Sequence, residues 1–380
     1  MRATPVSLIP GRDGTLHRRI WRGAPLALLA LVTLFELRIL RLLDAPWVQL
    51  TAYAEQKVVL GQALMKAYQN RLLGTVIIDG LARSLGLTYQ TAHGLVTGAI
   101  IAATNLVIYR LFVSLTRDWR TAMVSACTCI GLFVGLHDQR WLYVWDCIDA
   151  AVFALFAYGV FARRGVGFFA ALFAVEILNR EAALFIALWL VLDAVGVIRP
   201  GLKLCVRDRH KLASGVALMA FGALWTVLVR EAFWTPPPDR LVPVWDVFEG
   251  EMGNQLQLIE NVKRMAWSFT NPAFEPLVPV LLVALGVYFW RHRRDLDGHT
   301  GRALILLASL VTATLTLGVV HEVRIFHVLI PFVVAFHLTF TRRIAERRSR
   351  PSIEIVRAPS ARAGHDAPRP DRLQYEGTAP

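Results

Sequence analysis

The chain of 380 residues is 55% hydrophobic and only 18% charged, and its mean hydropathy is +0.47. A soluble domain carries roughly 25% charged residues, so this composition excludes an ordinary soluble protein and indicates a membrane protein. The formal net charge of +13 does not indicate nucleic-acid binding, because the basic residues form short clusters between apolar runs and match no reading motif.

The long apolar runs predict an all-α, polytopic bundle of membrane-spanning helices. A span needs about 20 residues to cross about 30 Å of hydrocarbon, and fewer inside a bundle, which gives about ten spans (roughly 8–11). The first run lacks a convincing cleavage site, so it is predicted to be a retained span. The predicted spans are residues 24–43, 93–113, 121–136, 147–162, 165–178, 182–198, 212–231, 276–290, 303–320 and 327–340.

Most Lys and Arg residues fall in the two tails and in alternate connections between these spans. The positive-inside rule therefore predicts that both termini lie in the cytoplasm. The predicted organisation is a basic N-terminal tail (1–23), a membrane domain (24–340) and a disordered C-terminal tail (341–380) rich in Arg, Pro and Ser. The expected location is the plasma (inner) membrane of a bacterium, crossed many times.

Two longer external loops are predicted, at 44–92 and 232–275. The first contains amphipathic stretches at 52–68 and 72–87, and the second stretch is expected to lie at the interface because Asp79 and Arg83, four residues apart, share one helix face.

The apolar run at 165–198 is too long for one span, since a single helix would measure about 50 Å. Asn179-Arg180-Glu181 interrupts it. The sequence therefore predicts two short spans that meet at a polar corner.

Charged residues at span ends fall almost entirely on the predicted outer side. Arginine binds phosphate oxygens bidentately and keeps its charge when partly buried, while a carboxylate can pair with it or act as a general base. The pattern predicts a site for a phosphorylated lipid, although Arg180 with Glu181, and Arg324 with Glu322, could equally be structural ion pairs. The motifs are Glu36, Arg38 and Asp44; Gln69-Asn70-Arg71; His137-Asp138-Gln139-Arg140; Asp146 and Asp149; Asn179-Arg180-Glu181; and His321-Glu322-Val323-Arg324.

Several single features have a structural alternative. Glu36 lies about 18 Å along the first span, where it could pair with Arg38 or extend outward with Arg41. Asp44 could be a solvated loop end or a helix cap. Gly94 and Gly98 form a GxxxG that more often marks close helix packing. The four cysteines show no metal-binding or disulfide spacing and are expected to be buried thiols.

The layout resembles the GT-C superfamily of polytopic glycosyltransferases, which use polyprenyl-phosphate-linked sugars at the outer membrane face. The first span, the helical first loop and the outer-face polar motifs carry the resemblance, which covers roughly 24–340 in architecture but only short stretches in sequence. Those stretches, which resemble strings in uncharacterised bacterial membrane proteins with the same layout, are Tyr68-Gln69-Asn70-Arg71-Leu72-Leu73, Leu178-Asn179-Arg180-Glu181 and His321-Glu322-Val323-Arg324-Ile325-Phe326.

The resemblance implies a catalytic base near the first span, at Glu36, Asp44 or Glu55, and a lipid phosphate held by Arg180 and Arg324. Its implied partners are a polyprenyl-phosphate-linked sugar, a glycan, lipid or protein acceptor, and membrane lipids. No cofactor is assigned. The need for a divalent metal stays open, because the first loop lacks an adjacent acidic pair or DxD. The implied substrate-binding residues are Asn70, Arg71, Asp146, Asn179, Arg180, Glu181, His321, Glu322 and Arg324.

Two other functions fit parts of the pattern. A polysaccharide polymerase or ligase would also place arginines on a lipid diphosphate, but usually has a larger late external loop than 232–275. A transporter or flippase for an anionic lipid or solute would use ionisable groups in or near spans, such as Glu36 and Glu176.

Overall fold

The computed structural model describes residues 14–63, 68–137, 142–195, 205–235, 258–270, 277–292, 298–317 and 323–349. These residues form helices, and the part of the chain described contains no strand, only an isolated bridge between Val195 and Val206. The predicted all-α class is therefore confirmed. The chain divides into two units, Met1–Thr341 and Arg342–Pro380, and the helix bundle belongs to the first.

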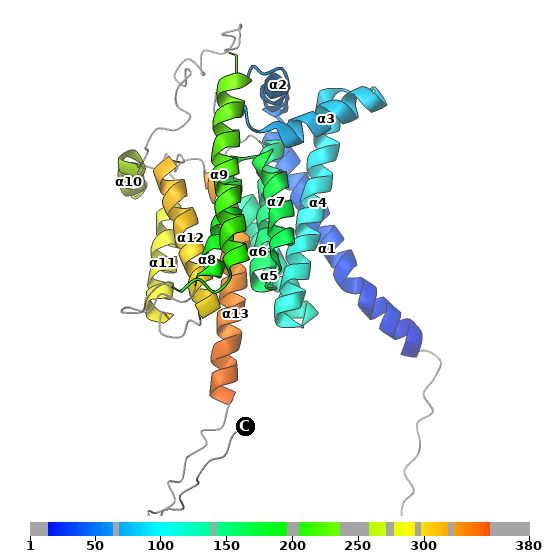
Figure 1. Cartoon of the computed structure of the whole chain (residues 1–380). Helices are drawn as coiled ribbons and strands as arrows, with labels where there is room; N and C mark the ends of the chain where they lie inside the picture. The colour runs from blue at the N-terminus through cyan, green and yellow to red at the C-terminus, as the bar shows by residue number, and fades with distance from the viewer. Residues whose placement is uncertain are drawn as a thin grey trace, which may run out of the picture. The chain divides into compact units, whose positions relative to one another are not determined.

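Each predicted span coincides with a described helix, although the bounds differ (Figure 1). The helix α1 begins at Gly14, inside the predicted N-terminal tail, and α13 continues to Ser349, past the predicted start of the disordered tail. The α-helices are α1 (Gly14–Asp44), α2 (Val48–Val59), α3 (Leu72–Leu85), α4 (Tyr89–Thr116), α5 (Trp119–Gly135), α6 (Val144–Phe161), α7 (Val166–Ile177), α8 (Leu184–Ala194), α9 (Arg209–Ala232), α10 (Leu258–Trp267), α11 (Leu277–His292), α12 (Gly298–Leu317) and α13 (Ile330–Ser349), and two 3-10 helices are η2 (Glu181–Ala183) and η6 (Val323–Leu329).

Four described helices, α4, α6, α9 and α12, are long and apolar enough to span a membrane. Helices α5 and α7 and the segment Phe326–Arg342 are apolar but shorter. A helix of 12 residues, the length of α7, measures about 18 Å, whereas the hydrocarbon layer is about 30 Å thick. Length and composition therefore support a membrane protein without fixing the number of spans.

The helix α2 ends at Val59, nine residues before the predicted end of its amphipathic stretch. Gly61 stops it, because its φ of +73° is a conformation that residues with a Cβ rarely adopt. A Cβ at this position would also lie 2.9 Å from the Phe233 carbonyl oxygen. The turn at Gly61 thus lets the first loop reach the end of α9.

The helix α3 is amphipathic, as predicted, and Asp79 and Arg83 form an ion pair of 3.0 Å on it. Its buried face includes Gly74, where a Cβ would lie 2.6 Å from the Val144 side chain of α6. The absence of a side chain at Gly74 therefore lets α3 approach α6 closely.

The predicted corner at 179–181 separates α7 from α8. Asn179 and Arg180 both donate their backbone N–H to the Glu176 carbonyl, and α8 begins only at Leu184. The predicted polar corner is thus present between two short helices, α7 and α8.

The helix α6 lies in the core of the bundle, with Trp145, Phe153 and Phe156 fully buried. Small residues on α6 let its neighbours approach, as helices in membranes require. At Gly159 a Cβ would lie 2.5 Å from the Phe168 ring of α7. Asp146 and Asp149, at the start of α6, are thus held on a closely packed helix.

The connections predicted to be external meet at one end of the bundle, which we call the Arg180 end. In Figure 1, α2 and α3 lie at this end, where α9 finishes. The hydrogen bonds that join the connections are Leu142 N–H to Asp44, Val144 N–H to Glu55, Asn70 to Glu181, Leu72 and Leu73 N–H to the Leu178 carbonyl, Trp234 to the Ala63 carbonyl and Thr235 N–H to the Gly61 carbonyl.

Connections predicted to be cytoplasmic meet at another place, the Asp193 end. The Asp193 carboxylate, near the end of α8, accepts hydrogen bonds from Lys211 Nζ of α9 at 2.6 Å and Arg302 Nη2 of α12 at 3.0 Å. His299 Nε2 lies 3.0 Å from the Val160 carbonyl oxygen of α6. The contacts of these connections thus involve other residues than those at the Arg180 end.

Candidate functional site

A segment of the first loop lies directly on the corner between α7 and α8. The backbone N–H groups of Leu72 and Leu73, which begin α3, both donate to the Leu178 carbonyl oxygen at 2.9 Å. This anchor brings Asn70 and Arg71, just before α3, beside Asn179, Arg180 and Glu181.

The corner residues Asn179 and Arg180 face the first turns of α6. Asn179 Nδ2 donates to Asp149 Oδ1 at 2.7 Å and to the Trp145 carbonyl at 3.1 Å. Arg180 Nη1 forms an ion pair with Asp149 and lies 3.6 Å from Asp146 Oδ1. Asp146 and Asp149 are three residues apart and so share a helix face. Burial lowers the pKa of Arg180, but these two carboxylates outweigh it and raise that pKa above its usual value.

The third corner residue, Glu181, joins the first loop to α9. Its Oε2 accepts from Asn70 Nδ2 at 2.9 Å, and its Oε1 lies 3.1 Å from Arg230 Nη2 near the end of α9. Burial raises the pKa of Glu181, but the positive charges of Arg230, Arg71 and Arg180 outweigh burial and lower this pKa to about 2. Glu181 is therefore a carboxylate at neutral pH.

Arg71 differs from the other two arginines because its guanidinium packs on aromatic rings, and the carboxylates of Asp146 and Glu181 act on it only from beyond ion-pair distance. The guanidinium carbon lies 4.0 Å from the Tyr68 ring centroid and 5.0 Å from that of Trp145. Only 7% of Arg71 is exposed, and no described carboxylate forms an ion pair with it. Burial and the nearby charge of Arg180 lower the pKa of Arg71, and the opposing effects of Tyr68, Asp146 and Glu181 do not outweigh them. The cation at Arg71 is thus only partly compensated.

We call this group the arginine cluster: Asn70, Arg71, Asp146, Asp149, Asn179, Arg180, Glu181 and Arg230. Four buried polar atoms, on Asn70, Arg71, Asn179 and the neighbouring Trp145, have no hydrogen-bond partner among the described residues. Buried polar atoms are nearly always paired, so an unpaired group of them marks a place where a ligand or water fits. The four atoms are Arg71 Nε, Trp145 Nε1, Asn70 Oδ1 and Asn179 Oδ1.

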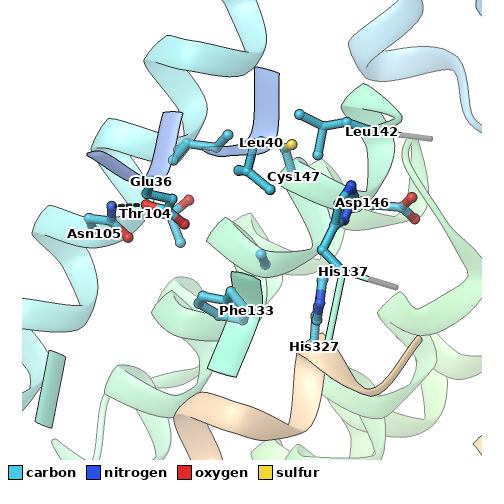
Figure 2. Close-up of a pocket in the computed structure, with 12 residues that line it drawn as sticks. Glu36, Leu40, Thr104, Asn105, Phe133, His137, Leu142, Asp146, Cys147 and His327 are labelled. Carbon is cyan, nitrogen blue, oxygen red and sulfur yellow. Dashed lines mark hydrogen bonds between the residues drawn. The ribbon is translucent and has the colours of Figure 1, made fainter. Parts of the chain in front are cut away.

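A small cavity of about 40 Å³ adjoins the cluster through Asp146 (Figure 2). Glu36 of α1 and Asp146 of α6 line opposite sides of it, and the buried rings of His137 and His327 stack with their centroids 6.4 Å apart. Glu36 Oε2 accepts a hydrogen bond of 2.5 Å from Asn105 Nδ2. Glu36 of the first helix therefore lies across this cavity from Asp146 of the arginine cluster.

The three candidate bases lie in different surroundings. Glu36 lines the cavity and is bonded to Asn105; among described residues it has no ion pair with Arg38 or Arg41, the two partners considered from the sequence. Asp44 accepts from Leu142 N–H at 3.2 Å. Burial raises its pKa, and this hydrogen bond partly offsets the effect.

Glu55 is fully buried and its carboxylate already has partners. One oxygen accepts from Val144 N–H at 2.8 Å and lies 3.5 Å from His93 Nε2, while the other accepts from the Tyr89 hydroxyl at 3.4 Å. Glu55 thus fixes the first turn of α6 and lines neither described cavity.

The structure brings six of the nine predicted binding residues together: Asn70, Arg71, Asp146, Asn179, Arg180 and Glu181. His321 and Glu322 lie outside the described residues, and Arg324 lies in η6, where only its backbone is described. Sequence reasoning missed Arg230 as a partner of Glu181. Arg230 is a basic residue in the last turn of a long apolar helix. That position could have indicated a charged residue at the same end of the bundle as Glu181.

Among the described residues, no three His, Cys, Asp or Glu side chains form a group that could hold a metal ion. No protein-family model, curated protein or solved structure matches the chain.

Proposed function

We propose that the chain is an integral membrane glycosyltransferase that transfers a sugar from a polyprenyl-phosphate carrier at the outer face of a bacterial plasma membrane. In this proposal the protein is multi-pass, the Arg180 end faces outward and the Asp193 end faces the cytoplasm. The distribution of charge supports this orientation, since the connections that meet at the Asp193 end carry basic residues, among them Lys211 and Arg302.

The observation that carries the proposal is Arg71. Two cation–π contacts contribute roughly 1–2 kcal/mol each, whereas removing a cation from water costs several kcal/mol. The guanidinium therefore lacks full compensation in this site, and a phosphate monoanion or diester would supply it. The unpaired Nε of Arg71 gives a phosphate oxygen a hydrogen-bond donor.

The other unpaired atoms suit the sugar. Asn70 Oδ1 and Asn179 Oδ1 accept hydrogen bonds, and Trp145 Nε1 donates one. Sugar hydroxyls both donate and accept, so they match this mixture, whereas a bare phosphate would leave the two amide oxygens unsatisfied. The cluster thus favours a phosphate that carries a sugar.

Arg180 and Arg230 are positioning residues in this proposal, since each already holds carboxylates. Arg180 ties the corner to α6, and Arg230 holds Glu181, which in turn holds Asn70. The sequence suggested that Arg180 contacts the phosphate directly. We propose instead that Arg71 binds the phosphate and that Arg180 positions the residues around it.

Glu36 is the proposed general base. It lines the cavity that reaches the cluster through Asp146, so an acceptor hydroxyl in this cavity would lie between the base and the phosphate site. In the transfer, the acceptor oxygen bonds to the anomeric carbon, the bond from that carbon to the phosphate oxygen breaks, and Glu36 takes the hydroxyl proton. Arg71 stabilises the charge that develops on the leaving phosphate.

The test is sugar transfer by the purified full chain in nanodiscs, with a synthetic polyprenyl-phosphate sugar as donor and a crude envelope glycan fraction as acceptor. We expect Glu36→Gln to lower kcat by about 10²–10⁴-fold, the usual contribution of a general base, without changing donor binding. Arg83→Ala, on the exposed surface of α3, is the control and keeps full turnover. Full turnover in Glu36→Gln would overturn the assignment of the base.

A carrier for an anionic lipid is the second candidate, and Glu176 is the observation that favours it. This carboxyl group is fully buried in α7, beside Asp149, and ionisable groups inside spans are typical of proton-coupled carriers. Lipid movement across liposome membranes by the purified chain, abolished by Glu176→Gln and without sugar transfer, would replace the transferase proposal.

A further inference from the structure

Three charged side chains from three helices meet at the Asp193 end, and we call them the Asp193 trio: Asp193, Lys211 and Arg302. The Asp193 carboxylate of α8 accepts a hydrogen bond from Lys211 Nζ of α9 at 2.6 Å and from Arg302 Nη2 of α12 at 3.0 Å. All three side chains are mostly buried. One carboxylate thus serves two cations, so the trio keeps one positive charge, and it shares no residue with the arginine cluster.

Close packing of α9 on α8 holds the trio in place. A Cβ at Gly215, one turn after Lys211, would lie 2.8 Å from the Val191 side chain of α8 and 3.0 Å from the Ala187 carbonyl oxygen. The two helices can approach this closely because Gly215 has no side chain. The Lys211 ammonium is therefore fixed beside Asp193 by the packing of the bundle.

The guanidinium of Arg302 has a hydrogen-bond donor left over. Its Nη2 is bonded to Asp193, but its Nε is buried and has no hydrogen-bond partner among the described residues. Buried polar atoms are nearly always paired, so this N–H marks a place for an acceptor atom of a ligand or of water. An anionic oxygen suits it best, because hydrogen bonds from a guanidinium to a carboxylate or phosphate are the strong ones.

Positive charge predominates around this trio. The charge of Arg163, just after α6, acts on the His299 ring of α12, and this ring lies 3.8 Å from the Asp193 carboxylate. The Arg207 backbone is also held here, because its N–H donates to the carbonyl of Ala194. A concentration of like charge attracts an ion of the opposite sign. The described residues of the two connections, 162–165 and 205–211, hold five basic side chains and one acidic one: Arg163, Arg164, Arg207, Arg209, Lys211 and Asp208.

The surroundings of Arg302 indicate that the anion belongs to a lipid. Both α9 and α12 are long and apolar enough to span a membrane, and Lys211 and Arg302 lie in their first two turns. Ile305, three residues after Arg302, shares a helix face with it and is 44% exposed. A cation thus lies at the end of a span with an open apolar side chain next to it. Basic pockets of this kind, between spanning helices, bind anionic lipid head groups.

We propose that the Asp193 end binds one anionic phospholipid of the adjoining leaflet through the phosphate diester of its head group. A phosphate oxygen accepts from Arg302 Nε, the charges of Lys211 and Arg163 add attraction, and an acyl chain lies along Ile305. A ligand that binds only the folded state stabilises it, so this lipid holds α8, α9 and α12 together. The site lies outside the arginine cluster and does not depend on the proposed sugar transfer.

Native mass spectrometry of the purified full chain, titrated in detergent with phosphatidylglycerol or phosphatidylcholine, tests this proposal. Both lipids carry a phosphate diester, but choline cancels its charge, so we expect one phosphatidylglycerol to bind about tenfold more tightly. Arg302→Lys keeps the charge beside Asp193 and lacks the Nε donor, which should raise the Kd for phosphatidylglycerol about tenfold. Arg163→Gln, at an exposed side chain, should raise this Kd about fivefold. Arg120→Gln, at an exposed arginine of another connection predicted to be cytoplasmic, is the matched control and keeps the Kd.

Equal affinity for the two lipids would overturn the proposal, and so would a Kd that Arg302→Lys and Arg163→Gln leave unchanged. Arg163 is exposed, so its variant tests the site even if Arg302→Lys unfolds. Inorganic phosphate in the same titration distinguishes a lipid from a free phosphate, since displacement of phosphatidylglycerol at equal concentration would overturn the assignment to a lipid. Phosphatidylglycerol should also raise the Tm of the natural protein more than that of Arg302→Lys. These readouts need no turnover, so they stand whether or not the chain transfers a sugar.

Discussion

Asn70 donates a hydrogen bond of 2.9 Å to Glu181, 111 residues further along the chain. The bond ties the first loop to the corner between α7 and α8, and Glu181 passes the constraint to Arg230 of α9. Arg71, next to Asn70, owes its place to this link. The position of Arg71, the proposed phosphate ligand, therefore depends on the hydrogen bond between Asn70 and Glu181.

Replacing Asn70 by alanine should loosen this link. A hydrogen bond to a charged group contributes about 1.5–3 kcal/mol, and Glu181 keeps Arg230 as a partner, so we expect Asn70→Ala to lower the free energy of unfolding by about 1–2 kcal/mol. Ser84→Ala, which removes only a local bond to the Leu81 carbonyl on an exposed helix face, should have almost no effect. Denaturant titration in detergent measures both, and equal stability of the two variants would contradict the link.

Glu181 should make stability depend on acid pH. Its pKa is lowered from 4.5 to about 2 in the folded protein, so its stabilising contribution is complete above pH 4.5 and disappears as the pH falls to about 2. Glu181→Gln should therefore be less stable than the natural protein at neutral pH and should lose less stability over that range. Thermal unfolding in detergent across these pH values tests the sign; parallel curves for the two proteins would refute it.

Two glycines on α3 provide a matched pair for close packing. Gly74→Ala places a methyl group 2.6 Å from Val144, which we expect to cost about 1–3 kcal/mol. Gly80→Ala on the same helix meets nothing within 4 Å and should stabilise by about 0.5–1 kcal/mol, since alanine favours the helix. We expect the unfolding midpoint to fall in Gly74→Ala and to rise in Gly80→Ala. Similar shifts in the two variants would mean that α3 does not pack on α6 in this way.

Loss of the Asp193 carboxylate should also lower the free energy of unfolding. Asp193→Asn leaves Lys211 and Arg302 without their shared partner, and breaking a buried pair typically costs about 3–5 kcal/mol, so about 2–4 kcal/mol is expected at this partly buried site. Asp79→Asn breaks an exposed pair with Arg83 and should cost under about 1 kcal/mol. Below its unfolding transition, the Asp193→Asn variant should bind the donor as the natural protein does, because the contacts at the Arg180 end do not involve Asp193.

The positions of the helices follow from the sequence because apolar length and polar interruptions act locally. The break at Asn179-Arg180-Glu181 and the ion pair between Asp79 and Arg83 were predictable in this way. The end of α2 was not, since Gly61 takes its positive φ where the first loop meets α9. Hydropathy does not report such a contact.

The prediction of alternating spans placed Asn70, Arg71 and Asn179 at one end of the bundle. It did not indicate which side chains form pairs there. Which arginine meets a carboxylate depends on the rotation of α6, α7 and α9 about their axes, and a shift of one residue turns a side chain by about 100°. Hence Arg180 could be expected near acids, whereas the pair of Glu181 with Arg230 and the ring-lined pocket of Arg71 could not.

Binding of a polyprenyl phosphate to the purified chain is the measurement that tests the central claim most directly. If Arg71 holds the phosphate, Arg71→Ala raises Kd at least about tenfold, as loss of a charge-assisted hydrogen bond of 1.5–3 kcal/mol requires, while Arg83→Ala binds as the natural protein does and the affinity for the uncharged polyprenol is the same in all three. Unchanged affinity of Arg71→Ala for the phosphate would contradict the account.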